Sequence, residues 1–358
     1  MGLFVHYSLA LIIALVVTVI TTPIVKRIAL KYNIVDIPND PRKIHTRKMP
    51  YLGGVAIALG FVAGFIYLQP NLPSTWAFLA GGFVILATGI IDDKVSLPAR
   101  YKMLGQILAA LIVVFSGVTV DFIQFPVIGR IEFGWWQYPI TIVWIVGITN
   151  AINFIDGLDG LAGGVSSIAL GSTIVMGILE QQTLAIALSV ILLGATIGFL
   201  FFNSYPAKIF MGDSGAMFIG YTMAYISIIG LFKSFTIFSL IIPIIILAVP
   251  IFDTSFAIVR RILRGQKIST PDRSHLHHCL LKLGFSHRTT VLIIYVISLI
   301  FGLSAIIFSR SVLWGSLIIL VLSVIMIRFT VEILDTLNNR RKPIINAVKK
   351  LQGSKGKP

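Results

Sequence analysis

Aspartate side chains recur at three points of the chain where long apolar segments begin or end. Asp92 and Asp93 adjoin each other, Asp156 and Asp159 lie three residues apart, and Asp213 precedes a further apolar segment. Oxygen ligands suit Mg²⁺, which typically binds one or two carboxylates together with substrate phosphates and water. Such a set indicates metal-assisted phosphoryl transfer, in which the metal neutralises a leaving pyrophosphate and a carboxylate orients or deprotonates the nucleophile.

The segment from 150 to 164 is unusually polar for its surroundings. It holds Asn150, Asn153, Asp156 and Asp159, with four glycines among its last eight residues. On a helix, Asp156 and Asp159 would share a face, and the glycines would allow a substrate or a neighbouring helix to approach closely. Polar groups at this depth are tolerated around a protein-lined or wet cavity.

Simpler explanations exist for single aspartates. Asp213 could act as a helix N-cap, and a lone Asp at a helix end is usually a cap or a loop charge. The pair Asp92 and Asp93 is different, because adjacent like charges repel unless a cation or a proton relieves them. We therefore expect the pair to have a function.

Histidines cluster in the longest polar loop, with four of the six lying between residues 275 and 287. Zinc binding is one interpretation, but the H-x-H-H spacing of His275, His277 and His278 suits tetrahedral ligation poorly and no cysteine pair accompanies it. A basic, histidine-rich loop better suits recognition of a phosphorylated, sugar-bearing donor. Positive charge that merely orients the chain in a membrane would explain the nearby arginines but not the histidines.

The elements that must position these residues are membrane helices. Of the 358 residues 56% are hydrophobic and 12% are charged, about half the charged fraction of soluble domains. The hydrophobicity excludes disorder, a single cysteine excludes a disulfide scaffold, and basic residues scattered between apolar runs argue against nucleic acid as a partner. The composition indicates an integral membrane protein, surrounded by membrane lipids.

Apolar runs long enough to span a bilayer, roughly 20 residues each, predict an all-α, polytopic bundle of about eleven transmembrane helices. The first run lacks a signal-peptide cleavage pattern and is expected to be retained. The predicted spans are 3–25, 52–70, 76–91, 103–120, 138–153, 161–179, 183–202, 214–232, 235–252, 290–309 and 312–330.

Charge predicts the orientation of this bundle. The loops that carry the aspartates and histidines, with the C-terminal tail, hold 26 of the 29 Lys and Arg residues, and the opposite loops hold 3. By the positive-inside rule the N-terminus lies outside, and the C-terminus and the site lie on the cytoplasmic face of the plasma membrane. We expect one membrane domain over 1–335 and a basic cytoplasmic tail over 336–358.

Four motifs in this order resemble the polyprenyl-phosphate N-acetylhexosamine-1-phosphate transferases. The resemblance covers about residues 20–335, and within the superfamily the chain is similar to bacterial enzymes that begin wall teichoic acid or related glycopolymers. The motifs are Asp92-Asp93-Lys94, Asn150 to Gly164, Met211 to Gly215, and Ser274 to His278.

The resemblance implies a role for each site residue. It makes Asp92 or Asp93 the group that deprotonates or positions the lipid phosphate, Asp213 the Mg²⁺ ligand, and Phe210 the ring that stacks on uracil. The remaining assignments are phosphate contacts for Lys94 and Lys102, the nucleotide-sugar pocket for Asn150, Asn153, Asp156 and Asp159, and donor selection for His275, His277 and His278. Cys279 departs from the pattern, since relatives often carry Arg there.

The implied reaction moves GlcNAc-1-phosphate from UDP-GlcNAc to undecaprenyl phosphate and releases UMP, with Mg²⁺ or alternatively Mn²⁺ as cofactor. Two alternatives stay open. One is the sister activity, phospho-MurNAc-pentapeptide transfer; the other is a secondary transporter, which would place its site near the midplane and often shows inverted repeats. The oligomeric state is also open, with a homodimer as one candidate.

Overall fold

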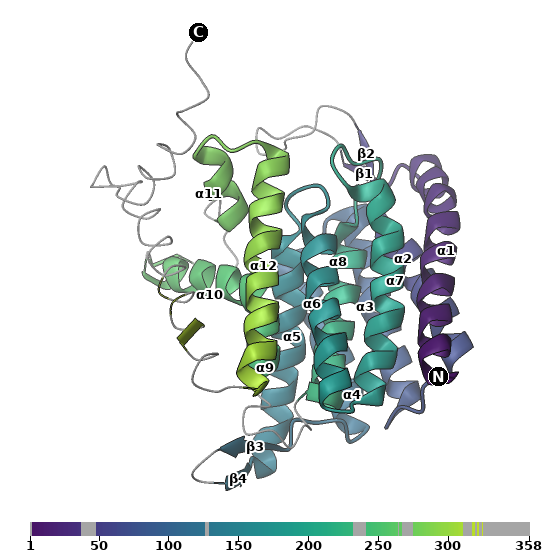
Figure 1. Ribbon diagram of the computed structural model, residues 1–358. Helices are drawn as coiled ribbons and strands as arrows, with labels where there is room; N and C mark the ends of the chain where they lie inside the picture. The colour runs from purple at the N-terminus through teal and green to yellow at the C-terminus, as the bar shows by residue number, and fades with distance from the viewer. Residues whose placement is uncertain are drawn as a thin grey trace.

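The computed structural model describes residues 2–36, 48–125, 129–231, 241–263, 265–266 and 275–310, with 317, 318, 321 and 324 beyond them. Within these residues it is a bundle of twelve α-helices (Figure 1). Their bounds are α1 Gly2–Lys31, α2 Gly53–Leu68, α3 Thr75–Val95, α4 Ala99–Phe115, α5 Gln137–Ile155, α6 Leu161–Leu179, α7 Thr183–Asn203, α8 Gly212–Ile226, α9 Ile241–Ile246, α10 Ala248–Leu263, α11 Leu276–Lys282 and α12 His287–Arg310.

Six segments of the described chain are helical, long and apolar enough to cross a membrane, which confirms the helical membrane fold. They comprise α1, α3, α6, α7, α12 and the segment Gly134–Ile155 that ends with α5. At 1.5 Å per residue, even a helix of 20 residues reaches about 30 Å, the thickness of a bilayer's hydrocarbon core.

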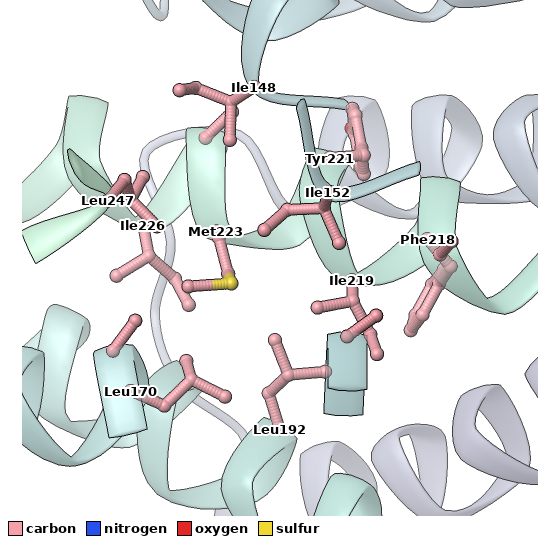
Figure 2. Close-up of a cluster of buried hydrophobic side chains, with 14 of the residues drawn as sticks. Ile148, Ile152, Leu170, Leu192, Phe218, Ile219, Tyr221, Met223, Ile226 and Leu247 are labelled. Carbon is pink, nitrogen blue, oxygen red and sulfur yellow. The ribbon is translucent and has the colours of Figure 1, made fainter. Parts of the chain in front are cut away.

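Helix α8 forms the centre of the bundle and packs against α3, α5 and α2. Nearly all of its residues are buried, and Figure 2 shows its side chains meeting those of α5, α6 and α7 in an apolar cluster. Tyr221 stacks on Phe78 of α3 with ring centroids 5.9 Å apart, and its hydroxyl donates to the Phe78 carbonyl over 2.9 Å. The bond satisfies the one polar atom of a ring that lies in an apolar interior.

Two short antiparallel hairpins accompany the helices and were not predicted. Val35–Asp36 (β1) pairs with Met49–Pro50 (β2), and Phe122–Phe125 (β3) pairs with Gly129–Glu132 (β4). They lie at opposite ends of the bundle: β1–β2 at the same end as α11, and β3–β4 at the end where α1 begins (Figure 1).

The predicted span 235–252 is wrong as a single helix within the described residues. Helix α9 ends at Ile246, and α10 begins at Ala248 and runs to Leu263 in a different direction, across the bundle (Figure 1). Pro250 has no N–H to donate to the Ile246 carbonyl four residues before it, so regular helix pairing fails at this point. The predicted span 312–330 and the tail 336–358 lie, apart from four single positions, outside the described residues.

Candidate active site

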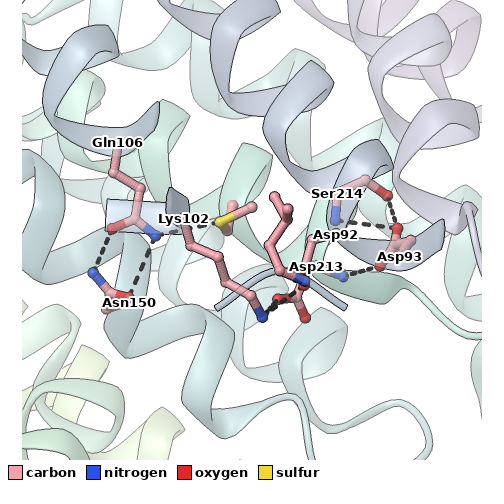
Figure 3. A network of polar contacts seen from close by, with 9 residues as sticks. Asp92, Asp93, Lys102, Gln106, Asn150, Asp213 and Ser214 are labelled. Carbon is pink, nitrogen blue, oxygen red and sulfur yellow. Dashed lines mark hydrogen bonds and ion pairs between the residues drawn. The ribbon is translucent and has the colours of Figure 1, made fainter. Parts of the chain in front are cut away.

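A cluster of charged side chains sits where α3, α4 and α8 meet. We call Asp92, Asp93, Lys102, Asp213 and Ser214 the carboxylate cluster. Asp93 of α3 lies 120 residues from Asp213 of α8 in sequence, but its carboxylate accepts a hydrogen bond from the Asp213 backbone N–H (Figure 3). The prediction that separate loops bring these carboxylates together is therefore confirmed for Asp92, Asp93 and Asp213.

Lys102 joins two of the carboxylates. Its Nζ lies 2.6 Å from Asp92 Oδ2 and 2.6 Å from Asp213 Oδ2. The two differ in access, because the Asp92 side chain is 6% exposed and that of Asp213 is 29% exposed. Asp92 Oδ1 also accepts the Leu97 N–H at 2.6 Å, which fixes the end of α3. Lys94, by contrast, is exposed at the end of α3.

Asp93 is turned toward the backbone of α8. Its carboxylate accepts the Asp213 N–H at 2.7 Å, the Ser214 N–H at 3.4 Å and the Ser214 hydroxyl at 2.6 Å. These backbone groups belong to the first turn of α8, where N–H groups have no partner inside the helix. Gly212 makes this approach feasible, since its φ is +72° and a Cβ would lie 2.5 Å from Asp93 Oδ2. Asp93 therefore acts as a cap supplied by another helix, which places Asp213.

The polar segment after residue 150 divides between a helix and a turn. Asn150 and Asn153 belong to α5, which ends at Ile155, whereas Asp156 and Asp159 lie in the turn before α6, so these two do not share a helix face. The pKa of Asp156 is raised to about 8, first by burial and then by the charges of Asp213, Asp93 and Asp159. Asp156 is thus within electrostatic range of Asp93 and Asp213, and added positive charge would favour its ionised form.

Asn150 and Asp159 already have protein partners. The Asn150 amide donates to Gln106 Oε1 at 2.6 Å and accepts from Gln106 Nε2 at 3.3 Å (Figure 3). Asp159 Oδ2 accepts the Ala207 N–H at 2.9 Å, tying its turn to the loop that leads to Phe210. Asn153 lies beside the Asp213 carboxylate, although its buried Nδ2 makes no hydrogen bond of ordinary geometry among the described residues.

Phe210 lies on the other side of the carboxylates, beside β2. Its ring is 6.0 Å from that of Tyr51, centroid to centroid, and its N–H donates to the Pro50 carbonyl at 2.9 Å. The Phe210 residue is partly exposed.

The histidines of α11 form a second group, which we call the histidine cluster: His275, His277 and His278 together with Asp253 of α10. His275 Nδ1 lies 2.8 Å from Asp253 Oδ2. His277 is buried, and its two ring nitrogens have no partner in the described part of the chain. Burial is the main reason that its pKa falls to about 3, so the ring is neutral at physiological pH.

Gly157 allows His277 to lie against the turn that carries Asp156. A Cβ at Gly157 would lie 2.3 Å from His277 Nε2, so only glycine lets the ring rest on the turn that carries Asp156. The histidine cluster therefore borders the same turn that faces the carboxylates.

Comparison with known proteins agrees with this arrangement. The model of the family described as "Glycosyl transferase family 4" matches residues 75–231. A relative from Bacillus subtilis (strain 168), named probable undecaprenyl-phosphate N-acetylglucosaminyl 1-phosphate transferase, is 47% identical over 347 residues, which is 96% of each chain. The chain belongs to glycosyl transferase family 4.

More distant family members carry two kinds of name. A decaprenyl-phosphate N-acetylglucosaminephosphotransferase of Mycobacterium tuberculosis (strain ATCC 25618 / H37Rv) is 34% identical, over 79% of this chain and 78% of its own. A phospho-N-acetylmuramoyl-pentapeptide-transferase of Halalkalibacterium halodurans is 31% identical, over 83% of this chain and 96% of its own.

The residues of this family 4 site suit a divalent cation. Two carboxylates already converge on one positive group, the Lys102 ammonium, and the pKa of Asp156 is raised by burial first and then by neighbouring carboxylates. An all-oxygen donor set is the one that Mg²⁺ prefers. In the described residues, however, no three of the His, Cys, Asp and Glu side chains stand close enough to form a metal cage by themselves, so phosphates and water would have to complete the shell.

Several residues of the family 4 site were missed in the sequence. Ser214 belongs to the Met211 to Gly215 motif, and Gln106 lies one helical turn after Lys102, so both could have been found by spacing. Asp253 comes directly after the predicted span 235–252, at the start of the loop that carries the histidines. No neighbouring feature of the sequence identifies Tyr51 as a site residue. The pKa of its hydroxyl is raised by burial and then by Asp36, Asp93 and Asp213.

Proposed function

We propose that this protein transfers GlcNAc-1-phosphate from UDP-GlcNAc to undecaprenyl phosphate, giving undecaprenyl-diphosphate-GlcNAc and UMP. The observation that carries the proposal is the 47% identity, over 96% of both chains, with a relative of that name. The carboxylate cluster supports it, because it gathers at one end of an apolar bundle the charges that phosphoryl transfer needs.

The site faces the cytoplasm in this proposal, and the N-terminus lies outside. Support comes from the loops around the site, which with the C-terminal tail hold 26 of the 29 Lys and Arg residues. The N-terminal end of α1 lies at the opposite end of the bundle from α11 and β1–β2 (Figure 1). A water-soluble nucleotide sugar can then enter from the cytoplasm while the lipid chain stays in the bilayer.

Asp213 is the proposed ligand of Mg²⁺, or of Mn²⁺, with Asp92 contributing from the opposite side of Lys102. Asp213 is the more exposed of the two carboxylates that Lys102 joins, at 29% against 6%. When bound, the metal would neutralise charge that develops on the pyrophosphate of the donor.

Asp92 is the proposed group that orients or deprotonates the lipid phosphate. Asp93 is less suited to this role, since its carboxylate is engaged by three donors of Asp213 and Ser214. Lys102 contributes a positive charge that moves little, and it can bind the incoming phosphate. Lys94, exposed at the helix end, contributes at most to attracting anionic substrates.

The reaction is a displacement at phosphorus. An oxygen of the lipid phosphate forms a bond to the β-phosphorus of UDP-GlcNAc, the bond from that phosphorus to the oxygen bridging the two donor phosphates breaks, and UMP leaves with that oxygen. One pyrophosphate replaces another, so the site mainly positions the reactants and neutralises charge.

The donor lies between the two clusters in this proposal. Phe210 stacks on uracil, and Asn153, which lies beside the Asp213 carboxylate, donates a hydrogen bond to the nucleotide sugar. Asp156 and the histidine cluster bind its phosphate and sugar. Asn150 and Asp159 act indirectly, by holding α4 against α5 and by fixing the loop before Phe210.

The product feeds a cell-wall glycopolymer such as wall teichoic acid. The alternative donor, UDP-MurNAc-pentapeptide, is kept as a second candidate because a relative named for muramoyl-pentapeptide transfer is 31% identical. A transporter is disfavoured, because the charged groups gather at the ends of α3 and α5 and at the start of α8 rather than at mid-helix.

The direct test is release of UMP by purified protein supplied with UDP-GlcNAc, undecaprenyl phosphate and Mg²⁺. We expect UMP only when all three are present, and UDP-MurNAc-pentapeptide should replace UDP-GlcNAc poorly. Absence of UMP with both Mg²⁺ and Mn²⁺ would refute the proposed activity.

A further inference from the structure

Asp253 is a buried acid on α10, and each of its two carboxylate oxygens contacts a residue at the start of α11. Oδ2 lies 2.8 Å from His275 Nδ1, and Oδ1 accepts the Leu276 N–H at 2.8 Å. The Asp253 residue is 6% exposed and His275 is 7% exposed. A single carboxylate thus holds both the backbone that begins α11 and the first imidazole of the histidine cluster.

The first of these contacts defines the state of the imidazole. A carboxylate accepts hydrogen bonds, so the proton of a neutral His275 must reside on Nδ1, and Nε2 keeps its lone pair. Carboxylates in this position fix both the tautomer and the orientation of a histidine ring. Asp253 is the one recorded side-chain hydrogen-bond partner of His275 in the described part of the chain.

His275 lies beside the proposed donor pocket. Its ring is 6.1 Å from that of Phe154, which stands between Asn153 and the end of α5. It also stacks on His277, with centroids 6.0 Å apart and planes 9° from parallel, and His277 rests on Gly157. A change in the orientation of His275 would therefore move His277 and alter its packing against the turn that carries Asp156.

His277 provides an internal contrast. It lies two residues from His275 on the same short helix, yet no described side chain bonds to either of its ring nitrogens. Of the two buried histidines, only His275 has an acid to set its tautomer.

We propose that Asp253 is a positioning residue for the transfer reaction, holding His275 in the Nδ1–H tautomer so that Nε2 is presented to the phosphate-sugar portion of the donor. The inference rests on the proposed function for the identity of the donor. Its structural part, the control of the tautomer, does not depend on turnover.

Asp253→Asn separates the two roles of the carboxylate. The Asn oxygen can still accept the Leu276 N–H, but its amide group donates toward His275 Nδ1 and therefore favours the Nε2–H tautomer. In ¹⁵N-histidine NMR at about pH 8.5, above the ordinary titration range of histidine, we expect the His275 Nδ1 resonance to change from protonated to unprotonated. His275→Gln assigns the resonance.

Kinetics on the same samples test the consequence. We expect kcat/KM for UDP-GlcNAc to fall about 10- to 100-fold in Asp253→Asn, with the KM for undecaprenyl phosphate unchanged, and little further loss in the double variant with His275→Gln. Asp121→Asn, which removes a carboxylate before the distant β3–β4 hairpin, is the matched control and should keep wild-type kinetics.

An unchanged His275 spectrum, or a changed spectrum with wild-type donor kinetics, would overturn the proposal. If Asp253→Asn does not fold, Asp253→Glu retains the carboxylate and should keep the wild-type tautomer; loss of that tautomer would also count against it. Failure of the proposed function is distinguishable, because the wild-type protein would then show the tautomer but no UMP release.

Discussion

The carboxylate cluster and the histidine cluster differ in how many of their polar atoms have partners among the described residues. Asp92, Asp93 and Asp213 each contact Lys102 or the first turn of α8. In the histidine cluster Asp253 holds His275, but His277 has two buried ring nitrogens without a partner among the described residues. An unpartnered buried polar atom costs free energy, so we expect the donor to bind beside His277 and to satisfy these nitrogens.

This difference assigns distinct tasks to the two regions. A cluster whose charges are fixed before substrate arrives can stabilise a transition state without reorganising. A cluster with unused hydrogen-bonding capacity gains most when the correct donor binds. We therefore expect changes in the carboxylate cluster to lower kcat and changes in the histidine cluster to raise the KM for the donor.

The largest effect is expected for Asp213→Asn. Loss of this charge removes the proposed metal ligand and one partner of Lys102, so UMP release should fall at least about 10³-fold, since metal stabilisation of transition-state charge is worth several kcal/mol. The protein should still elute as folded protein in detergent. Turnover near the wild-type rate would exclude Asp213 as the metal ligand.

Lys102→Met is expected to come next. The substitution keeps much of the side-chain volume but leaves Asp92 and Asp213 facing each other without a cation, and we expect kcat to fall about 10²-fold. Lys94→Met is the matched control, because Lys94 carries the same charge at the exposed end of α3 and should stay within about twofold of wild type. Equal losses in both variants would mean that only net charge matters.

Gly157→Ala tests the histidine cluster alone. The new Cβ would collide with His277 Nε2, which lies 2.3 Å from the required position, so the ring must move away from the Asp156 turn. We expect the KM for UDP-GlcNAc to rise about 10-fold with kcat nearly unchanged. Gly147→Ala, in the middle of α5 and with nothing within 4 Å of a Cβ, should behave as wild type. A fall in kcat without a KM change in Gly157→Ala would contradict the division of tasks.

The smallest effect is a pH dependence of stability caused by His277. Its pKa is about 3 in the folded protein and about 6.5 in an unfolded chain, so the unfolded state binds more protons between these values. The folded state is therefore favoured fully above about pH 6.5 and loses stability as the pH falls toward 3. His277→Gln should flatten the decline of Tm between about pH 7.5 and pH 5.5, and His6→Gln, at an exposed position, should not.

The sequence was sufficient to predict the bundle and the meeting of its polar loops. Continuous apolar runs predict helices, and the alternation of loops across a membrane places 92–93, 156–159 and 213 at one end whatever the packing. The motif around Asp213 likewise marks the start of α8.

The division of roles within the site could not be predicted in this way. Asp92 and Asp93 are identical neighbours in sequence, and only the contact with α8 shows that one faces Lys102 and the other caps a helix. Two further contacts also depend on helix packing between distant segments. Asn150 hydrogen-bonds Gln106, and Asp253 contacts His275 at the start of α11. The helical structure is interrupted between α9 and α10, just before Pro250. Proline predicts such an interruption, but the direction in which the next helix runs depends on the residues that pack around it.

The fate of the β-phosphorus tests the central claim most directly. Purified protein, undecaprenyl phosphate and Mg²⁺ would be incubated with UDP-GlcNAc labelled with ³²P at the β-position, and the lipid and aqueous phases separated. Attack at the β-phosphorus predicts that the label moves with GlcNAc into the lipid phase and that the released UMP is unlabelled. Label retained in UDP, as transfer of the sugar alone would leave it, would contradict the account.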